Sequence, residues 1–256
     1  MAPSPNPGVI IRLNPRVILR CACATIAVLA LVSVLDDLLS PSTSNVYWRV
    51  ASLESERSLA TAYAVLQLAG CAAAAFVAGY ALRRGDRPWA RHWYAAGVLL
   101  AFVAADEHIG LHESVSEEMH DRWDTGGILR YPWVLPAVVV VVVLVVVFLP
   151  FVRALPRPVR TLVFAAAVVY LVGAVGFEVI GGLVDDDTKD LTTAFIVATT
   201  TEETLELVGV ALMGYAVTRY LAEFVEPVSL TTAERVSTAA SDPSPAPTHD
   251  GSGTST

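Results

Sequence analysis

Long apolar runs are the feature that most restricts how this chain can fold. The clearest run, WVLPAVVVVVVLVVVFLP at residues 133–150, holds no charged side chain. A helix needs about 20 apolar residues to cross the hydrocarbon core of a bilayer, and several runs approach that length. Over the whole chain 54% of the residues are hydrophobic and 16% are charged, against about 25% charged in soluble domains. We therefore expect an integral membrane protein.

The apolar runs predict an all-α bundle of six transmembrane helices. A short basic, Pro-rich lead of residues 1–16 precedes the transmembrane domain of residues 17–221, and a disordered tail rich in Ser, Thr and Pro covers residues 227–256. The three cysteines lie in or beside apolar runs, which favours small buried side chains over a disulfide framework. The six expected spans cover residues 21–39, 59–82, 93–111, 133–150, 162–183 and a stretch within 191–221.

The basic residues set the expected orientation. Six spans place both termini on one side of the membrane, and the side with more Arg and Lys faces the cytoplasm. Both termini are therefore expected to be cytoplasmic in a multi-pass protein of the plasma membrane. The net charge of −8 gives no nucleic-acid signal, because the acidic residues gather in the outer loops. The terminal side holds Arg12, Arg16, Arg20, Arg83, Arg84, Arg87, Arg91, Arg153, Arg157, Arg160, Arg219 and Arg235, and the other side holds Arg49, Arg57, Arg122, Arg130 and Lys189.

Acidic residues lie inside several of the expected spans, where each ionised group costs at least about 2.5 kcal/mol. The helix rise places them about 20 to 27 Å from the arginines at the inner ends of their own helices. Four helices thus bring acids to one layer in the outer half of the bilayer. On a straight helix Asp106, Gly110 and Glu113 would share one face, and His108 and His112 another. The acids of the layer are Asp36, Asp37, Asp106, Glu178, Glu202, Glu203 and Glu206.

Plainer explanations stay open for part of this set. Glu202 and Glu203 could form a capping box with the preceding threonines at the outer start of a shorter helix. The two neighbouring aspartates of the first span could mark where that helix leaves the membrane, and His108 could be an interfacial imidazole. The glutamate of the fifth span is harder to explain in this way, because the apolar Phe177 and Val179 flank it. Gly173 and Gly176 would let another helix approach beside it.

Clustered carboxylates in a low-dielectric layer repel one another unless positive charge joins them. The acids can take up protons, bind cations or face a water-filled vestibule. The spans hold no Arg or Lys at this depth, and His120 is expected in a solvated loop. Carboxylates with an imidazole are typical ligands of iron, manganese or zinc in helical bundles, although the Glu-x-x-His signature is absent. The expected metal ligands are Asp106, His112, Glu113, Glu178, Glu203 and Glu206, and the expected catalytic proton carriers are Glu107 and Glu203.

Three short motifs carry a resemblance to known proteins. They are DExxxxHE at residues 106–113, GFE at residues 176–178 and EExxE at residues 202–206. Their arrangement resembles a group of uncharacterised prokaryotic multi-spanning membrane proteins over roughly residues 90–221, and this resemblance implies no particular activity. A looser resemblance to membrane hydrolases of the ceramidase and adiponectin-receptor type implies a zinc site of three histidines and an aspartate. The spans here hold too few histidines for that site.

Two functions are compatible with such a site. The first is a metal-dependent oxidoreductase or hydrolase acting on a lipid-like substrate, with a glutamate moving protons. The alternative is a transporter or channel for protons, metal ions or organic cations, which would use the same acids. The lack of polar residues in the inner halves of the second to fifth spans counts against a continuous path. The expected partners are the bilayer and a lipid-like or cationic small molecule; the sequence leaves open whether the protein is an enzyme, and its oligomeric state.

Overall fold

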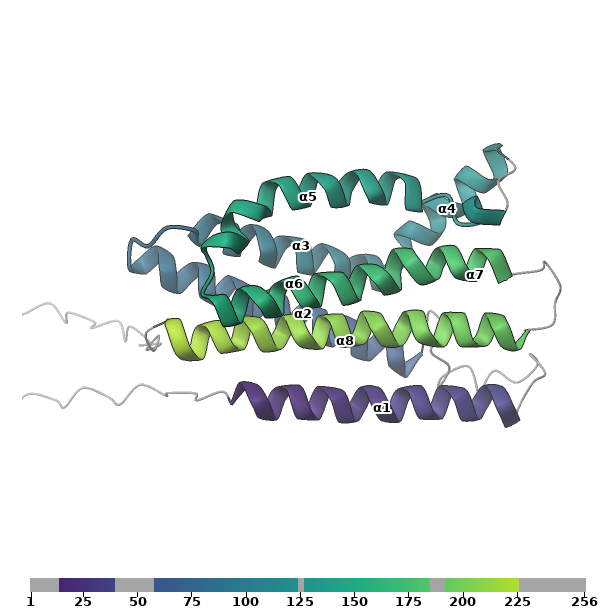
Figure 1. The fold of residues 1–256 in the computed structure, drawn as a ribbon, viewed down its shortest axis with the longest axis horizontal. Coiled ribbons are helices and arrows are strands. Elements are labelled where there is room, and N and C mark those ends of the chain that lie inside the picture. Colours follow the sequence, from purple (N-terminus) through teal and green to yellow (C-terminus); the bar gives the residue numbers. More distant parts are fainter. Residues whose placement is uncertain (1–13, 40–57, 124–126, 185–191, 226–256) are drawn as a thin grey trace, which may run out of the picture. The chain divides into compact units, whose positions relative to one another are not determined.

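The structure, a computed structural model, describes residues 14–39, 58–123, 127–184 and 192–225 (Figure 1). Its regular elements are all helices, and no strand occurs within these described ranges. The expected disordered tail, residues 227–256, lies outside them. The elements are α1 Pro15–Leu39, α2 Leu59–Arg84, α3 Ala90–Ile109, α4 Leu111–Trp123, the 3₁₀ turn η2 Gly127–Leu129, α5 Val134–Ala154, α6 Arg157–Leu171, the π-helical segment η3 Val172–Phe177, α7 Glu178–Val184 and α8 Thr193–Phe224.

Five of the described helical stretches are long and apolar enough to cross a membrane, and a bent pair of helices can make a sixth. The bent pair is α3 and α4, whose axes differ by 62° across a short break. The expectation of six apolar spans is confirmed at the level of helix length and composition, provided that this pair counts as one span. The five unbent stretches are Pro15–Leu35, Leu59–Arg84, Val134–Ala154, Arg157–Val184 and Thr193–Phe224.

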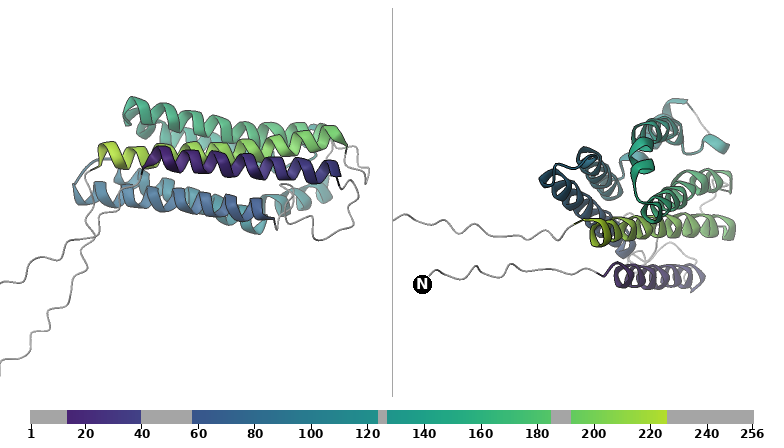
Figure 2. Two further views of the ribbon diagram at one scale, coloured as in Figure 1. Left: turned by 90° about the horizontal axis from the view of Figure 1, so that it is seen from below. Right: turned by 60° about the vertical axis from the view of Figure 1, so that its left-hand side comes forward.

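Helix α8 contacts α1, α2, α6, α7 and η3, and Figure 2 shows α1 running alongside it. The helix starts at Thr193 because the side chain of Thr192 accepts a hydrogen bond from the backbone N–H of Phe195 and caps the first turn. Glu202 and Glu203 therefore lie more than two turns inside α8. The alternative that they form a capping box at the outer helix start is wrong.

Helix α8 packs closely against α6 and η3 at two glycines. A Cβ atom added at Gly209 would stand 2.7 Å from the Cβ of Tyr170, and one added at Gly173 would stand 2.9 Å from the backbone oxygen of Glu202. Real Cβ atoms do not tolerate such distances, so only glycine permits this approach. The close contact expected at Gly173 is confirmed, whereas Gly176 meets no neighbouring helix and that expectation is wrong.

The two ends of the bundle differ in chemistry. The α2–α3 turn lies beside the end of α8, because the guanidinium of Arg87 donates a hydrogen bond to the backbone oxygen of Phe224. A buried apolar cluster fills the interior next to this arginine-rich end. Its buried members are Ala75, Ala78, Leu82, Trp93, Phe151, Leu155, Val159 and Val217.

Candidate functional site

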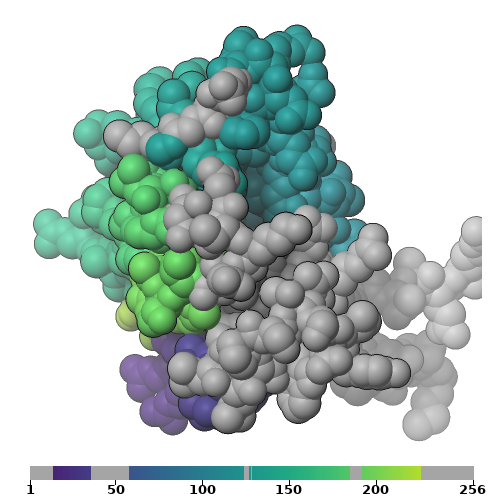
Figure 3. Space-filling model, turned by 90° about the vertical axis from the view of Figure 1, so that its right-hand side faces the viewer, coloured from purple at the N-terminus to yellow at the C-terminus, as the bar shows by residue number. Residues whose placement is uncertain are grey.

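A pocket of about 450 Å³ lies toward the end of the bundle opposite the apolar cluster. Figure 3 views this end of the molecule, where teal residues of the α3–α5 region face the green start of α8. The pocket walls come from α2, α3, α4, the segment before α5, α6, η3, α7 and α8. The acidic residues that line it are Asp106, Glu107, Glu113, Glu117, Glu178, Glu202, Glu203 and Glu206.

A sharp corner between α3 and α4 shapes one wall. Gly110 ends α3 in the left-handed conformation with φ +61°, which other residues rarely adopt, and its N–H donates to the backbone oxygen of Asp106 at 2.8 Å. The chain then starts α4 at Leu111 in a new direction. The expectation that Asp106, Gly110 and Glu113 share a face of one straight helix is therefore wrong, because helical phase does not carry across the break.

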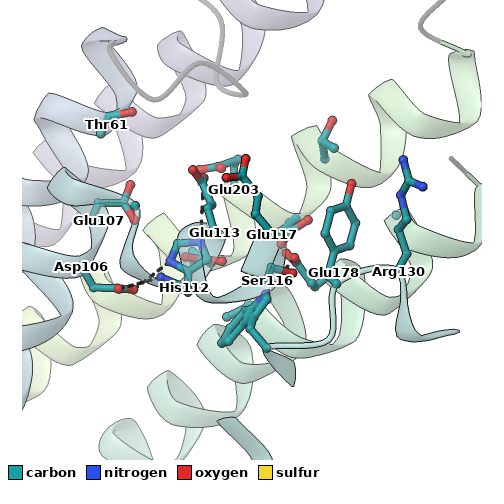
Figure 4. A pocket seen from close by; sticks show the side chains of 18 of the residues that line it. Thr61, Asp106, Glu107, His112, Glu113, Ser116, Glu117, Arg130, Glu178 and Glu203 are labelled. Carbon is teal, nitrogen blue, oxygen red and sulfur yellow. Dashed lines mark hydrogen bonds and ion pairs between the residues drawn. The ribbon is translucent and has the colours of Figure 1, made fainter. Parts of the chain in front are cut away.

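The corner nevertheless brings Asp106 and His112 together (Figure 4). Oδ1 of Asp106 accepts the backbone N–H of His112 at 3.2 Å, and Oδ2 lies 2.8 Å from Nδ1 of the His112 ring. The carboxylate thus caps the start of α4 and fixes the orientation of the imidazole. The other ring nitrogen, Nε2, lies 3.9 Å from Oε1 of Glu113 in the pocket.

The opposite wall holds two facing carboxyl groups. Glu178 is the first residue of α7, directly after the π-helical segment η3, and π-helical turns often occur at functional sites. The indole N–H of Trp133 donates to Oε1 of Glu178 at 2.9 Å. The carboxyl of Glu178 also lies within hydrogen-bonding reach of the carboxyl of Glu202 on α8.

The acid of the pocket that lies furthest along α8 is paired with an aromatic hydroxyl. The hydroxyl of Tyr170 on α6 hydrogen-bonds with the carboxyl of Glu206. Tyr170 is half-buried and also lies within electrostatic reach of Glu107, Asp106 and Glu203. These carboxyl groups therefore form one interacting cluster.

The sequence-predicted site residues gather in this pocket. Asp106, Glu107, His112, Glu113, Glu178, Glu203 and Glu206 all line it, and Glu202 joins them. His108 is exposed on α3 and is not among the lining residues. Asp36 and Asp37 belong to the last turns of α1, but their side chains lie outside the described residues.

Several residues line the pocket that the sequence alone did not predict as site residues. Arg130, from the segment before α5, places a cation at the pocket, which a search of the spans alone for Arg and Lys does not find. His120 lies half-buried on α4 and lines the pocket, which corrects its expected place in a solvated loop. Most valines of α5 are exposed, as in a lipid-facing helix, yet Trp133 just before that helix reaches the site. The sequence feature that could have indicated Arg130 and Trp133 is the position of a basic and an aromatic residue directly before an apolar span.

The expected metal ligands share a pocket without forming a ready ligand shell. Within the described ranges, no group of three or more His, Cys, Asp or Glu side chains is placed to hold a metal ion. Pairs that approach one another include Asp106 with His112, His112 with Glu113, and Glu178 with Glu202.

One family comparison gives a match. The sequence model of a family described as "Domain of unknown function (DUF8692)" matches residues 20–220. The matched range contains every residue that lines the pocket. No curated protein and no solved structure matches the chain.

The corner between α3 and α4 gives a stability prediction. Asp106→Ala removes the side chain that caps α4 and should lower the free energy of unfolding by about 0.5–2 kcal/mol. Asp106→Asn keeps an oxygen for the backbone N–H of His112 and should lose less. The measurement is thermal unfolding of the detergent-purified protein. Asp121→Ala, at an exposed position of α4, is the matched control and should change little; equal unfolding temperatures for Asp106→Ala and this control would contradict the capping role.

Proposed function

The chain belongs to the DUF8692 family of domains of unknown function, and we propose that it is a multi-pass membrane protein that binds a cation in an outward-facing pocket. The helices long and apolar enough to span a bilayer support the membrane location. Arginines gather at the α2–α3 and α5–α6 turns, at the end away from the pocket, and the positive-inside rule assigns that end to the cytoplasm. On this assignment both termini are cytoplasmic and the pocket opens to the outer side of the plasma membrane.

The observation that carries the cation proposal is the facing pair of carboxyl groups from Glu178 and Glu202. Two ionised carboxylates offer only acceptors, so a hydrogen bond between them needs a proton, and without one they repel each other. Either a proton or another cation must therefore accompany the pair. Six further acids line the same pocket, together with one arginine, Arg130.

The apolar inner end favours a binding site that is reached from the outside, and it argues against a continuous channel through the membrane. Trp93, Phe151 and Val217 are almost fully buried in the cluster that fills this end. An ion crossing it would lose its hydration without gaining polar partners. This packing still permits transport by a protein that alternates between an outward-open and an inward-open conformation.

Metal-dependent chemistry is a second candidate, favoured by the pairing of Asp106 with His112. Histidines that bind metals commonly donate their other ring N–H to a carboxylate, which is the arrangement at Nδ1. Nε2 would then act as a ligand or as a base. In this case Glu178, Glu203 and Glu206 would supply further oxygen ligands, and iron, manganese and zinc all suit such a mixed set.

Neutralising one carboxyl of the facing pair tests cation binding. Among Mn²⁺, Zn²⁺, Fe²⁺ and primary amines, at least one cation should raise the unfolding temperature of the purified protein. Glu202→Gln should weaken that binding at least tenfold, about 1.4 kcal/mol, because it removes one negative charge from the pair. Glu223→Gln, at the other end of the same helix and outside the pocket lining, is the matched control. Stabilisation by no cation, or equal affinities in the two variants, would contradict the proposal.

The orientation has its own test. A green fluorescent protein fused after residue 256 should fluoresce, because this reporter folds in the cytoplasm. Alkaline phosphatase inserted after Lys189 should be active, because it needs the oxidising outer side. The opposite pattern at both positions would show that the pocket faces the cytoplasm.

A further inference from the structure

The size of the pocket indicates an occupant of several atoms. Its volume is about 450 Å³, whereas one water molecule takes a share of about 30 Å³ in the liquid. Pockets for small molecules commonly measure about 300–1,000 Å³. A single metal ion with a few waters would leave much of this space to be filled by something else.

The acceptors of the pocket are spread over several walls. Asp106 and Glu113 flank the α3–α4 corner, Glu178 and Glu202 face each other between α7 and α8, and Glu206 lies beside Tyr170. A metal ion needs its ligands to converge on one point. A cation with several N–H donors can instead meet acceptors on different walls, since each ammonium group donates up to three hydrogen bonds.

A buried serine provides an independent sign of a ligand. Ser116 on α4 is 6% exposed and lines the pocket, and its Oγ atom has no hydrogen-bond partner in the described structure (Figure 4). A buried hydroxyl without a partner is costly, so a group in the pocket is expected to meet it. A hydroxyl can accept a hydrogen bond from an ammonium group.

Aromatic side chains complete the walls. The indole of Trp133 is held by its hydrogen bond to Glu178 at 2.9 Å and by a tilted contact with the His112 ring, whose centroid lies 5.1 Å away. Tyr170 and Phe195 also line the pocket. Aromatic faces attract organic cations, so these rings and the carboxylates favour the same class of ligand.

From these features together we infer that the ligand carries one or more primary ammonium groups, either as a free amine or as the headgroup of an amine-bearing lipid. The inference rests on the proposed function, because it names the class of cation that the pocket binds. In this assignment the N–H groups of the ligand donate to the carboxyl groups on the different walls and to the Oγ of Ser116, and the carbon atoms of the ligand lie against the aromatic rings.

Calorimetric titration of the detergent-purified full chain with spermidine tests the inference. Spermidine should bind, and Glu202→Gln and Glu113→Gln should each weaken its affinity at least tenfold, while Glu223→Gln leaves it unchanged. Because the two pocket variants lie on different helices, the other one still tests the inference if one of them does not fold. Ser116→Ala should weaken binding by a smaller factor, because it removes one acceptor and no charge.

Lipid nanodiscs distinguish the two sources of the ammonium group. If the natural ligand is a lipid headgroup, phosphatidylethanolamine nanodiscs should raise the unfolding temperature above that in phosphatidylcholine, whose quaternary nitrogen has no N–H. Pocket variants should lose this difference, and spermidine should compete with it. Equal stability in both lipids, with spermidine bound, would identify a free amine.

Metal titration separates failure of this inference from failure of the proposed function. Binding of Mn²⁺, Zn²⁺ or Fe²⁺ that Glu202→Gln abolishes, without binding of spermidine or of the ethanolamine lipid, would overturn the ammonium ligand and leave cation binding standing. If the amines and the metals all fail to bind folded protein, both proposals are overturned.

Discussion

The cost of placing carboxylates inside an apolar helical bundle is the constraint on which the rest of this structure depends. A lone acid at any one of these positions would be removed from water without compensation. Gathered around one pocket, the acids share its polar neighbours, which include Arg130, His112 and Tyr170. The bonds of Asp106 to His112, of Glu178 to Trp133 and of Glu206 to Tyr170 show that each wall also supplies local partners.

Irregular backbone makes this gathering possible. The left-handed Gly110 turns the chain through the 62° corner that places His112 over Asp106. The π-helical segment η3 immediately precedes Glu178, and Gly173 within it lets α8 approach closely enough for Glu202 to reach that carboxyl. Both of these irregular segments border the polar site, whereas a buried apolar cluster fills the interior at the far end.

Much of this arrangement could be predicted from the sequence. Hydropathy locates the spans, and the constant rise of a helix predicts similar depths for Glu178 and Glu206, which both line the pocket. Helical phase failed at Gly110, because a periodicity argument assumes an unbroken helix. Arg130 and Trp133 were missed because they enter from a connecting segment, and the sequence gives no direct measure of which connection folds over which helix end.

The central claim is that carboxyl groups from separate helices meet at one place, and proximity cross-linking in intact membranes tests it most directly. Cysteines would replace Glu178 and Glu202 in a chain without native cysteines, with a protease site inserted in residues 185–191. A short bifunctional thiol reagent should keep the two fragments joined after cleavage. The pair at 178 and 223, which places the second cysteine at the far end of α8, should separate. If the cross-linking yield of the cysteines at positions 178 and 202 is no higher than that of the distant pair, the account is contradicted.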